Sequence, residues 1–121
     1  MAVRVYQNAF HVPGTLAADL AIRFTVPFDC QLIHISAVSS DADAAGLTVG
    51  NSTTAAAYLA KASCGVSGTP VEFDRDNFVD GQYPHIAKGT IFAAAVDHDY
   101  NAGGGASDSA DLTLVFTFTE G

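Results

Sequence analysis

Apolar and polar residues alternate with a period of two along most of this chain, and almost no stretch has the period of a helix. The clearest alternation puts four apolar residues on one face of a predicted strand, namely Leu20, Ile22, Phe24 and Val26. Pro27 ends this strand, because proline has no amide hydrogen to donate to a neighbouring strand. The pattern therefore predicts short β-strands separated by turns.

The same alternation predicts further strands at residues 3–6, 30–38, 47–50, 71–73, 90–96 and 112–119. In the second of these segments, strict alternation places Leu32 on the face opposite Ile35 and Ala37. Residues 54–62 fit a strand or a single helical turn, and we favour the strand. Four stretches are predicted to be connections, at residues 41–46, 65–70, 74–88 and 97–111.

The last predicted strand has the most apolar face, which consists of Leu112, Leu114, Phe116 and Phe118. An edge strand with such a face would invite aggregation through its unpaired backbone. We therefore expect this strand to lie inside a sheet, with a neighbour on each side.

Seven or eight short strands with turn signals between them predict an all-β fold, an antiparallel β-sandwich. Among sandwiches, the eight-stranded jelly roll fits best, because its connections tolerate unequal lengths. An immunoglobulin-type sandwich fits less well, because the chain has no tryptophan. We divide the chain into an N-terminal strand or arm, residues 1–16, with Pro13-Gly14 as a pivot, and a single sandwich domain, residues 17–121.

Composition limits the classes of partner. The 121 residues suit one domain, and 13 Asp and Glu against 5 Lys and Arg give a formal net charge of −8. Binding to nucleic acid needs clustered basic residues, so we expect no nucleic-acid partner. The longest apolar run, residues 91–96, is too short to cross a bilayer, so we expect no membrane partner. The start lacks the pattern of a secretory signal, which favours synthesis and retention in a cytosol.

The candidate reactive residues form no catalytic motif. The four histidines, His11, His34, His85 and His98, lie in no metal-binding pattern, and we interpret His34 as a hydrogen-bonded core or interface residue. Cys30 and Cys64 could pair only with each other, and we expect buried free thiols. We therefore predict no enzyme activity, no catalytic residues and no cofactor.

One loop has partial calcium-ligand spacing. Four oxygen-bearing residues follow the spacing of an EF-hand loop, namely Asp97, Asp99, Asn101 and Asp108. The turn glycine of that loop is replaced by Ala102, the last ligand is Asp rather than Glu, and no flanking helices are predicted. We favour a solvated connection, with a calcium site as the alternative.

Two other loops gather carboxylates that could on paper serve glycoside hydrolysis, namely Asp41, Asp43, Asp74, Asp76 and Asp80. A sugar site also needs aromatic surfaces, and the only loop aromatics are Phe78, Tyr83 and Tyr100. We interpret these acids as solvated surface residues.

Four segments, at residues 24–32, 47–50, 88–91 and 114–121, resemble the jelly-roll head decoration, or cement, proteins of tailed bacteriophages. The resemblance implies a structural virion protein on the capsid surface, with the major capsid protein and further copies of itself, as a homotrimer, for partners. The segment 1–16 would then grip the capsid or a neighbouring subunit. The alternative is a receptor- or glycan-binding module of a phage fibre or tail, because jelly rolls serve both roles.

Overall fold

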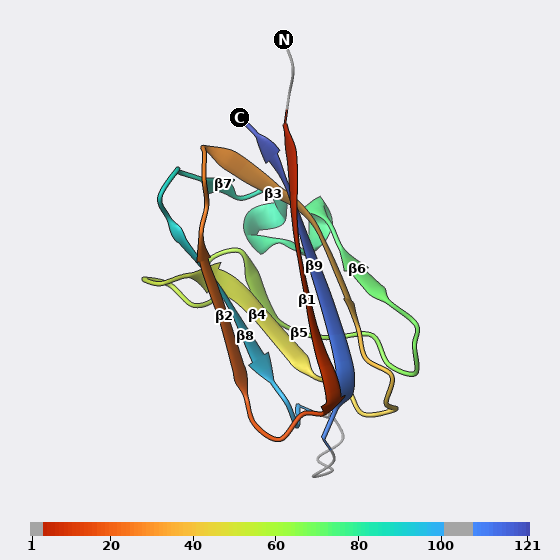
Figure 1. The fold of residues 1–121 in the computed structure, drawn as a ribbon. Coiled ribbons are helices and arrows are strands. Elements are labelled where there is room, and N and C mark those ends of the chain that lie inside the picture. The colour runs from red at the N-terminus through yellow and green to blue at the C-terminus, as the bar shows by residue number, and fades with distance from the viewer. Residues whose placement is uncertain (1–3, 101–107) are drawn as a thin grey trace.

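The computed structural model describes residues 4–100 and 108–121 (Figure 1). Within them the chain forms strands β1 (Val5–Thr15), β2 (Leu20–Thr25), β3 (Cys30–Val38), β4 (Gly46–Asn51), β5 (Leu59–Ser63), β6 (Val71–Phe73), β7 (His85–Ile86), β8 (Ile91–Asp97) and β9 (Ala110–Glu120). Two short 3-10 turns, η1 (Arg75–Asn77) and η2 (Val79–Gly81), lie between β6 and β7. None of the described residues belongs to a helix that is long and apolar enough to span a bilayer.

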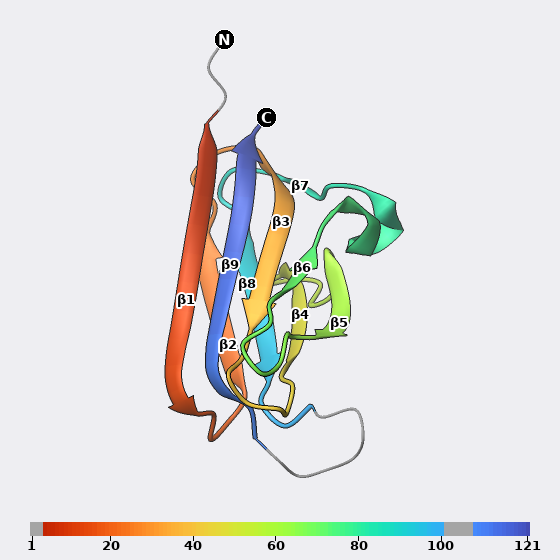
Figure 2. The ribbon, with the colours of Figure 1, turned by 90° about the vertical axis from the view of Figure 1, so that its right-hand side faces the viewer.

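The strands form two antiparallel sheets that pack face to face (Figures 1 and 2). One sheet has the order β1-β9-β3-β6, with β7 also paired to β3, and the other has the order β2-β8-β4-β5. The chain changes sheet at every connection except β4–β5 and β6–β7, which is the strand order of a jelly roll. The predicted antiparallel sandwich is therefore confirmed, and β7 is a two-residue addition to it.

β9 occupies the central position that its apolar face predicted. It lies between β1 and β3 and pairs with both in antiparallel register. Its four inward residues, Leu112, Leu114, Phe116 and Phe118, are at most 1% exposed. Because both edges of the strand are paired, its backbone donors and acceptors are satisfied within the sheet.

Phe92 on β8 joins the two sheets. Its ring centroid lies 5.2 Å from that of Phe116 and 5.3 Å from that of Phe118, both on the facing sheet. Within its own sheet it stacks on Phe24 at 4.9 Å, and Tyr58 lies at 6.0 Å. Such ring pairs stabilise a core by about 0.5–1.5 kcal/mol beyond the burial of their area.

The face assignment within β3 was wrong. Leu32, Ile35 and Ala37 are all fully buried, so they share the inward face instead of alternating. The register with β9 shifts between Leu32 and His34, which makes Ile33 an extra residue in this strand. A bulge of this kind reverses the phase of alternation, and a sequence pattern alone does not reveal it.

The first strand is longer than predicted, since it covers Val5–Thr15 rather than residues 3–6. Asn8 hides the alternation, because this polar residue occupies an inward position between Tyr6 and Phe10. Its Nδ2 atom donates a hydrogen bond to Tyr6 Oη at 2.6 Å, which satisfies the amide in that position. Most of the predicted N-terminal segment is therefore a strand of the sandwich, and its role as an arm stays a prediction.

The ambiguous stretch at residues 54–62 is a strand only from Leu59 onward. Before it, the side chain of Asn51 accepts hydrogen bonds from the backbone N–H groups of Thr53 and Thr54, which turns the chain. The turn packs against Gly50, where a Cβ atom would lie 2.3 Å from the Thr54 carbonyl oxygen. A strand was therefore the wrong prediction for residues 54–58.

Both cysteines are buried and free, as expected. Burial raises the pKa of the Cys64 thiol to about 12 and also raises the pKa of Cys30. A thiol that stays protonated is a poor nucleophile and a poor metal ligand. The two residues therefore serve the core as small apolar side chains.

We expect replacement of Phe92 by alanine to lower the free energy of unfolding by about 3–5 kcal/mol, because it removes the ring that links the sheets. Ile91→Ala is the matched control, since Ile91 is the next residue of β8 but is 42% exposed on the outer face. It should lower the free energy by no more than about 1 kcal/mol. Urea denaturation measures both values, and equal losses would contradict the assignment of faces.

Candidate functional site

Carboxylates gather at one end of the sandwich, which we call the acidic end. Of the 13 Asp and Glu residues, those on or beside the connections β1–β2, β3–β4 and β8–β9 are Asp19, Asp41, Asp43, Asp97, Asp99, Asp108 and Asp111. Figures 1 and 2 show these connections together, opposite the end where the chain begins and finishes. The acidity of the chain is therefore concentrated, although its carboxylates are spread along the sequence.

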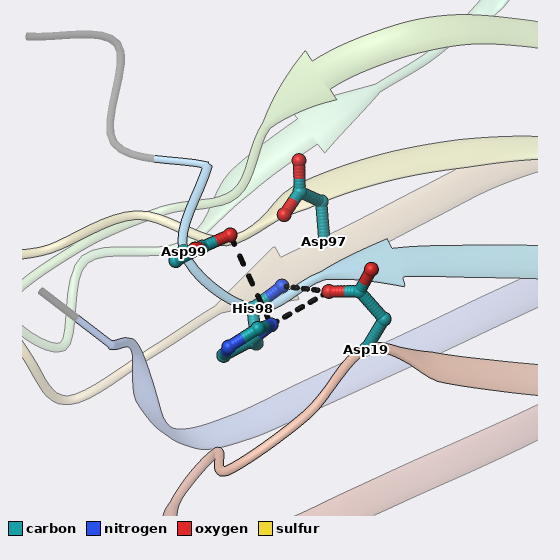
Figure 3. Close-up of side chains that lie close together, drawn as sticks. All are labelled: Asp19, Asp97, His98 and Asp99. Carbon is teal, nitrogen blue, oxygen red and sulfur yellow. Dashed lines mark hydrogen bonds and ion pairs between the residues drawn. The ribbon is translucent and has the colours of Figure 1, made fainter. Parts of the chain in front are cut away.

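His98 stands among three of the carboxylates at this end, in a group that we call the His98 cluster. Asp19 Oδ1 lies 2.6 Å from His98 Nδ1 and accepts a hydrogen bond from the His98 backbone N–H at 3.1 Å. Asp99 approaches the same ring nitrogen at 3.9 Å (Figure 3). Asp108 lies 3.5 Å from Nε2. The cluster therefore ties the β1–β2 connection to the segments that follow β8 and precede β9.

This geometry favours the charged form of the histidine. The hydrogen bond to Asp19 raises the pKa of His98, and the carboxylates of Asp99 and Asp108 act in the same direction. The same hydrogen bond lowers the pKa of Asp19. The Asp19 side chain is 69% exposed and that of His98 is 21% exposed, so water screens the pair, and it positions the loops more than it stabilises the fold.

Asp97 belongs to a second pair. Its Oδ2 atom lies 2.6 Å from Lys61 Nζ on β5, and this contact lowers the pKa of Asp97 and raises that of Lys61. The Lys61 ammonium also lies 5.2 Å from the centroid of the Tyr100 ring. That ring packs on Gly46, where a Cβ atom would lie 2.7 Å from Tyr100 Cγ, so a larger residue there would displace the ring.

Asp111 fixes the end of β1 to the same region. Its carboxylate accepts hydrogen bonds from the Gly14 backbone N–H at 2.6 Å and from Ser40 Oγ at 2.7 Å. The bond from Ser40 is the main cause that lowers the pKa of Asp111. The acidic end is therefore a set of hydrogen-bonded carboxylates that hold three connections in place.

The calcium alternative can now be compared with the geometry. Asp97 and Asp99 do lie together, and ligand atoms of Asp19 and His98 join them within 4.8 Å. Asp108 contacts His98 instead, and Asn101 lies outside the described residues. Lys61 and His98 already supply positive charge to these carboxylates, whereas calcium takes six to eight oxygen ligands. The carboxylates of Asp19, Asp97 and Asp99 therefore already face positively charged groups, and these ion pairs explain why they lie together.

The other histidines lie outside the core. His34 Nε2 lies 3.1 Å from Glu72 Oε1 on the outer face of β3, so its expected hydrogen bond is confirmed and a core position is wrong. His11 Nδ1 lies 2.8 Å from Thr113 Oγ1, and His85 is exposed on β7. The bulge at Ile33 explains the outward direction of His34.

The carboxylates considered for glycoside hydrolysis are not brought together. Asp41 and Asp43 lie on the β3–β4 connection, whereas the other three lie in the segment of η1 and η2, towards the opposite end (Figure 2). Asp41 accepts a hydrogen bond from the Asp43 backbone N–H, and Asp74 caps η1. These two carboxylates shape turns of the backbone.

One open hollow has an exposed aromatic ring. Tyr83, which is 42% exposed, borders a depression of about 410 Å³ together with Val79 and His85. Of the other loop aromatics, Phe78 is buried at 3% exposure and presents no ring at the surface. Tyr58 also lines the hollow but is 7% exposed, so Tyr83 is its exposed tyrosine.

The outer face of the β1-β9-β3 sheet is poor in charge. Two rows that cross the three strands consist of Gln7, Thr117 and His34, and of Ala9, Val115 and Ser36. The carboxylates nearest to it are at its borders, with Glu72 on β6 and Asp111 at the acidic end. Depletion of charged residues is typical of the centres of protein interfaces.

Comparison with solved structures gives a match to a chain of the cyanophage Pam1 capsid asymmetric unit. The TM-score is 0.58, and the match covers 98% of this chain and 85% of that chain at 16% sequence identity. At this identity the match shows a shared fold. The sequence matches no protein-family model and none of the curated proteins with which it was compared.

We expect the His98 cluster to make thermal stability depend on pH. The pKa of His98 in the folded protein is raised above the ordinary histidine value of 6.5. The stability that this shift contributes is therefore fully present below pH 6.5 and is lost as the pH rises through the raised pKa. The pKa of Asp19 in the folded protein is lowered below the ordinary aspartate value of 3.8. The stability that this shift contributes is present above pH 3.8 and is lost as the pH falls through the lowered pKa. His98→Gln should therefore lower the melting temperature most between these two values, as measured by scanning fluorimetry across pH.

His85→Gln provides the matched control for this pH series, because His85 is an exposed histidine on β7, away from the acidic end. Its melting curve should follow that of the unmodified protein at every pH. If the difference between the unmodified protein and His98→Gln stays constant across the series, the cluster has no linked protonation.

We further expect calcium to leave the melting temperature unchanged. A resident ion would stabilise the fold by mass action, in proportion to the logarithm of its concentration over its dissociation constant. Lys61 and His98 already pair with the carboxylates that the ion would need. Scanning fluorimetry with calcium and with a chelator measures this, and a rise that the chelator reverses would restore the calcium alternative.

Proposed function

We propose that this protein is a structural component of a bacteriophage particle that binds the outside of the assembled capsid and reinforces it. The observation that carries the proposal is the fold that the chain shares, over nearly its whole length, with a chain of a phage capsid asymmetric unit. The resemblance to head decoration proteins supports the same role. The partners would be the major capsid protein and further copies of this chain, assembled as trimers on the capsid surface.

Electrostatics favour the outside of the shell over the inside. The interior of a tailed phage capsid holds packaged DNA, a dense polyanion that attracts basic and repels acidic surfaces. A chain with a formal net charge of −8 and a concentrated acidic end is unsuited to that surrounding. The same charge suits a partner surface that is basic.

Reinforcement does not require one tight contact. A trimer that spans several capsid subunits engages them together, so modest affinities combine through a high effective concentration. The outer face of β1, β9 and β3 is poor in charge, and its nearest carboxylates, Glu72 and Asp111, lie at its borders. A partner that covered this face would therefore bury no carboxylate at the centre of the contact. These features support assembly as the role of the domain.

The alternative is a receptor- or glycan-binding module of a phage fibre or tail. The observation in its favour is the hollow beside Tyr83, where Gln82 and His85 supply polar groups near an exposed ring. Ligand sites combine aromatic surface with a few placed polar groups, but they usually enclose most of the ligand. This hollow is open, so we favour the capsid role.

We expect the purified protein to sediment as a trimer and to bind, saturably, to capsid shells of the phage that encodes it. Analytical ultracentrifugation gives the oligomeric state, and co-sedimentation followed by electron microscopy gives the stoichiometry and the bound face. Bound shells should also resist heat better than bare shells. A protein that ignores the shells but gives a clear sugar hit on a glycan array would support the alternative instead.

A further inference from the structure

β1 is an open edge of the five-stranded sheet. It pairs with β9 on one side, and no strand of the described residues pairs with it on the other. Residues 5–12 contain no Lys, Arg, Asp or Glu, whereas the two edge strands of the other sheet, β2 and β5, carry Arg23 and Lys61. Proteins commonly protect exposed edges with charges, proline or very short strands. This stretch of β1 has none of these protections.

The register identifies which backbone groups are free. The Glu120 N–H donates to the Arg4 carbonyl oxygen at 2.8 Å, and the pairing with β9 continues without a shift from Val5 to Val12. Because bonded pairs alternate in an antiparallel ladder, every second residue directs its N–H and C=O away from β9. These residues are Val5, Gln7, Ala9 and His11.

Side-chain contacts agree with this assignment. Gln7 Nε2 donates to Thr117 Oγ1 at 3.0 Å, and His11 Nδ1 lies 2.8 Å from Thr113 Oγ1. Pairs that do not exchange backbone hydrogen bonds bring their side chains closest together. The free groups therefore form a continuous row along the edge.

Partly exposed aromatic rings lie beside this row. Tyr6 and Phe10 point inward from β1, and their ring centroids lie 6.5 Å and 6.0 Å from that of Phe24 on β2. All three residues are only partly buried, so this side of the sandwich remains open between two strand edges. An additional strand along β1 would cover Tyr6 and Phe10 further, and it would gain apolar contact as well as hydrogen bonds.

The row ends at the acidic end. Pro13 has no N–H to offer, and the Gly14 N–H is already bonded to Asp111. Asp19 follows on the connection to β2. A strand docked on β1 would thus pass uncharged groups along most of its length and reach carboxylates at one end.

We propose that the free edge of β1 accepts an extended segment of a capsid subunit as an added strand, uncharged along its middle and basic where it reaches Asp19 and Asp111. This inference rests on the proposed function and specifies its contact. Backbone hydrogen bonds to Val5, Gln7, Ala9 and His11 supply the affinity, and the charges set the direction of the strand.

Charge complementarity favours this occupant over a second copy of the chain. In a second copy, the basic residue next to β1 is Arg4, and it is already paired with Glu120. Edge-to-edge pairing of two copies would therefore bring no net positive charge to the acidic end. A basic segment of another protein would bring positive charge to the acidic end.

Ala9→Pro tests the edge with little change to the sandwich. The Ala9 N–H points away from β9, so proline removes a donor from the free edge and leaves the ladder to β9 intact. Ala9→Thr is the matched control, because it keeps the N–H. We expect Ala9→Pro to bind shells at least about tenfold more weakly, and Ala9→Thr to bind like the unmodified protein.

Hydrogen exchange on the unmodified protein tests the same edge without a variant. The amides of Gln7, Ala9 and His11 should exchange fast in the free protein and become protected when it binds shells. Amides of Tyr6 and Asn8, which bond to β9, should be protected in both states. Binding should also weaken as salt concentration rises, because salt screens the charges at the acidic end.

The outcomes separate this inference from the proposed function. If the unmodified protein does not bind shells, both are overturned. If it binds while Ala9→Pro binds equally and the edge amides stay unprotected, the edge inference alone is overturned. Protection of these amides in the protein without shells, at concentrations where it self-associates, would assign the edge to a second copy and overturn the capsid segment.

Discussion

The packing of Phe92 against Phe116 and Phe118 decides the direction of the side chains on the two strands that it joins. β9 pairs with both β1 and β3, so the inward or outward direction of each β9 side chain is shared by the residues paired with it. This packing between the sheets, which also includes Tyr6 and Phe10 beside Phe24, thus determines which face of β1 is apolar. It also determines which of the β1 backbone groups remain unpaired.

Segregation of charge follows from the same arrangement. With both inner faces apolar and the outer face of β1, β9 and β3 poor in charge, the carboxylates collect in the connections. Three connections meet at one end, so residues that are far apart in sequence form a single acidic surface. The molecule therefore has an acidic end next to a charge-poor face formed by β1, β9 and β3.

Strands with uninterrupted alternation, such as β2 and β9, were predictable, because apolar residues at every second position leave one arrangement. The prediction failed where a local interaction replaced alternation. Ile33 bulges from β3, and Asn8 takes an inward position because Tyr6 accepts its hydrogen bond. Asp19 was missed as the partner of His98, because 79 residues separate them and only the topology brings them together.

The ion pairs of the acidic end matter for position more than for stability. Exposed pairs contribute little free energy, since water screens them and long side chains lose freedom in forming them. Yet Asp19 holds the connection that leaves β1, and Asp111 holds Gly14 at the end of that strand. These contacts fix where the unpaired edge stops and where carboxylates begin. In the proposed contact with a capsid subunit, this boundary would select the direction in which the added strand lies.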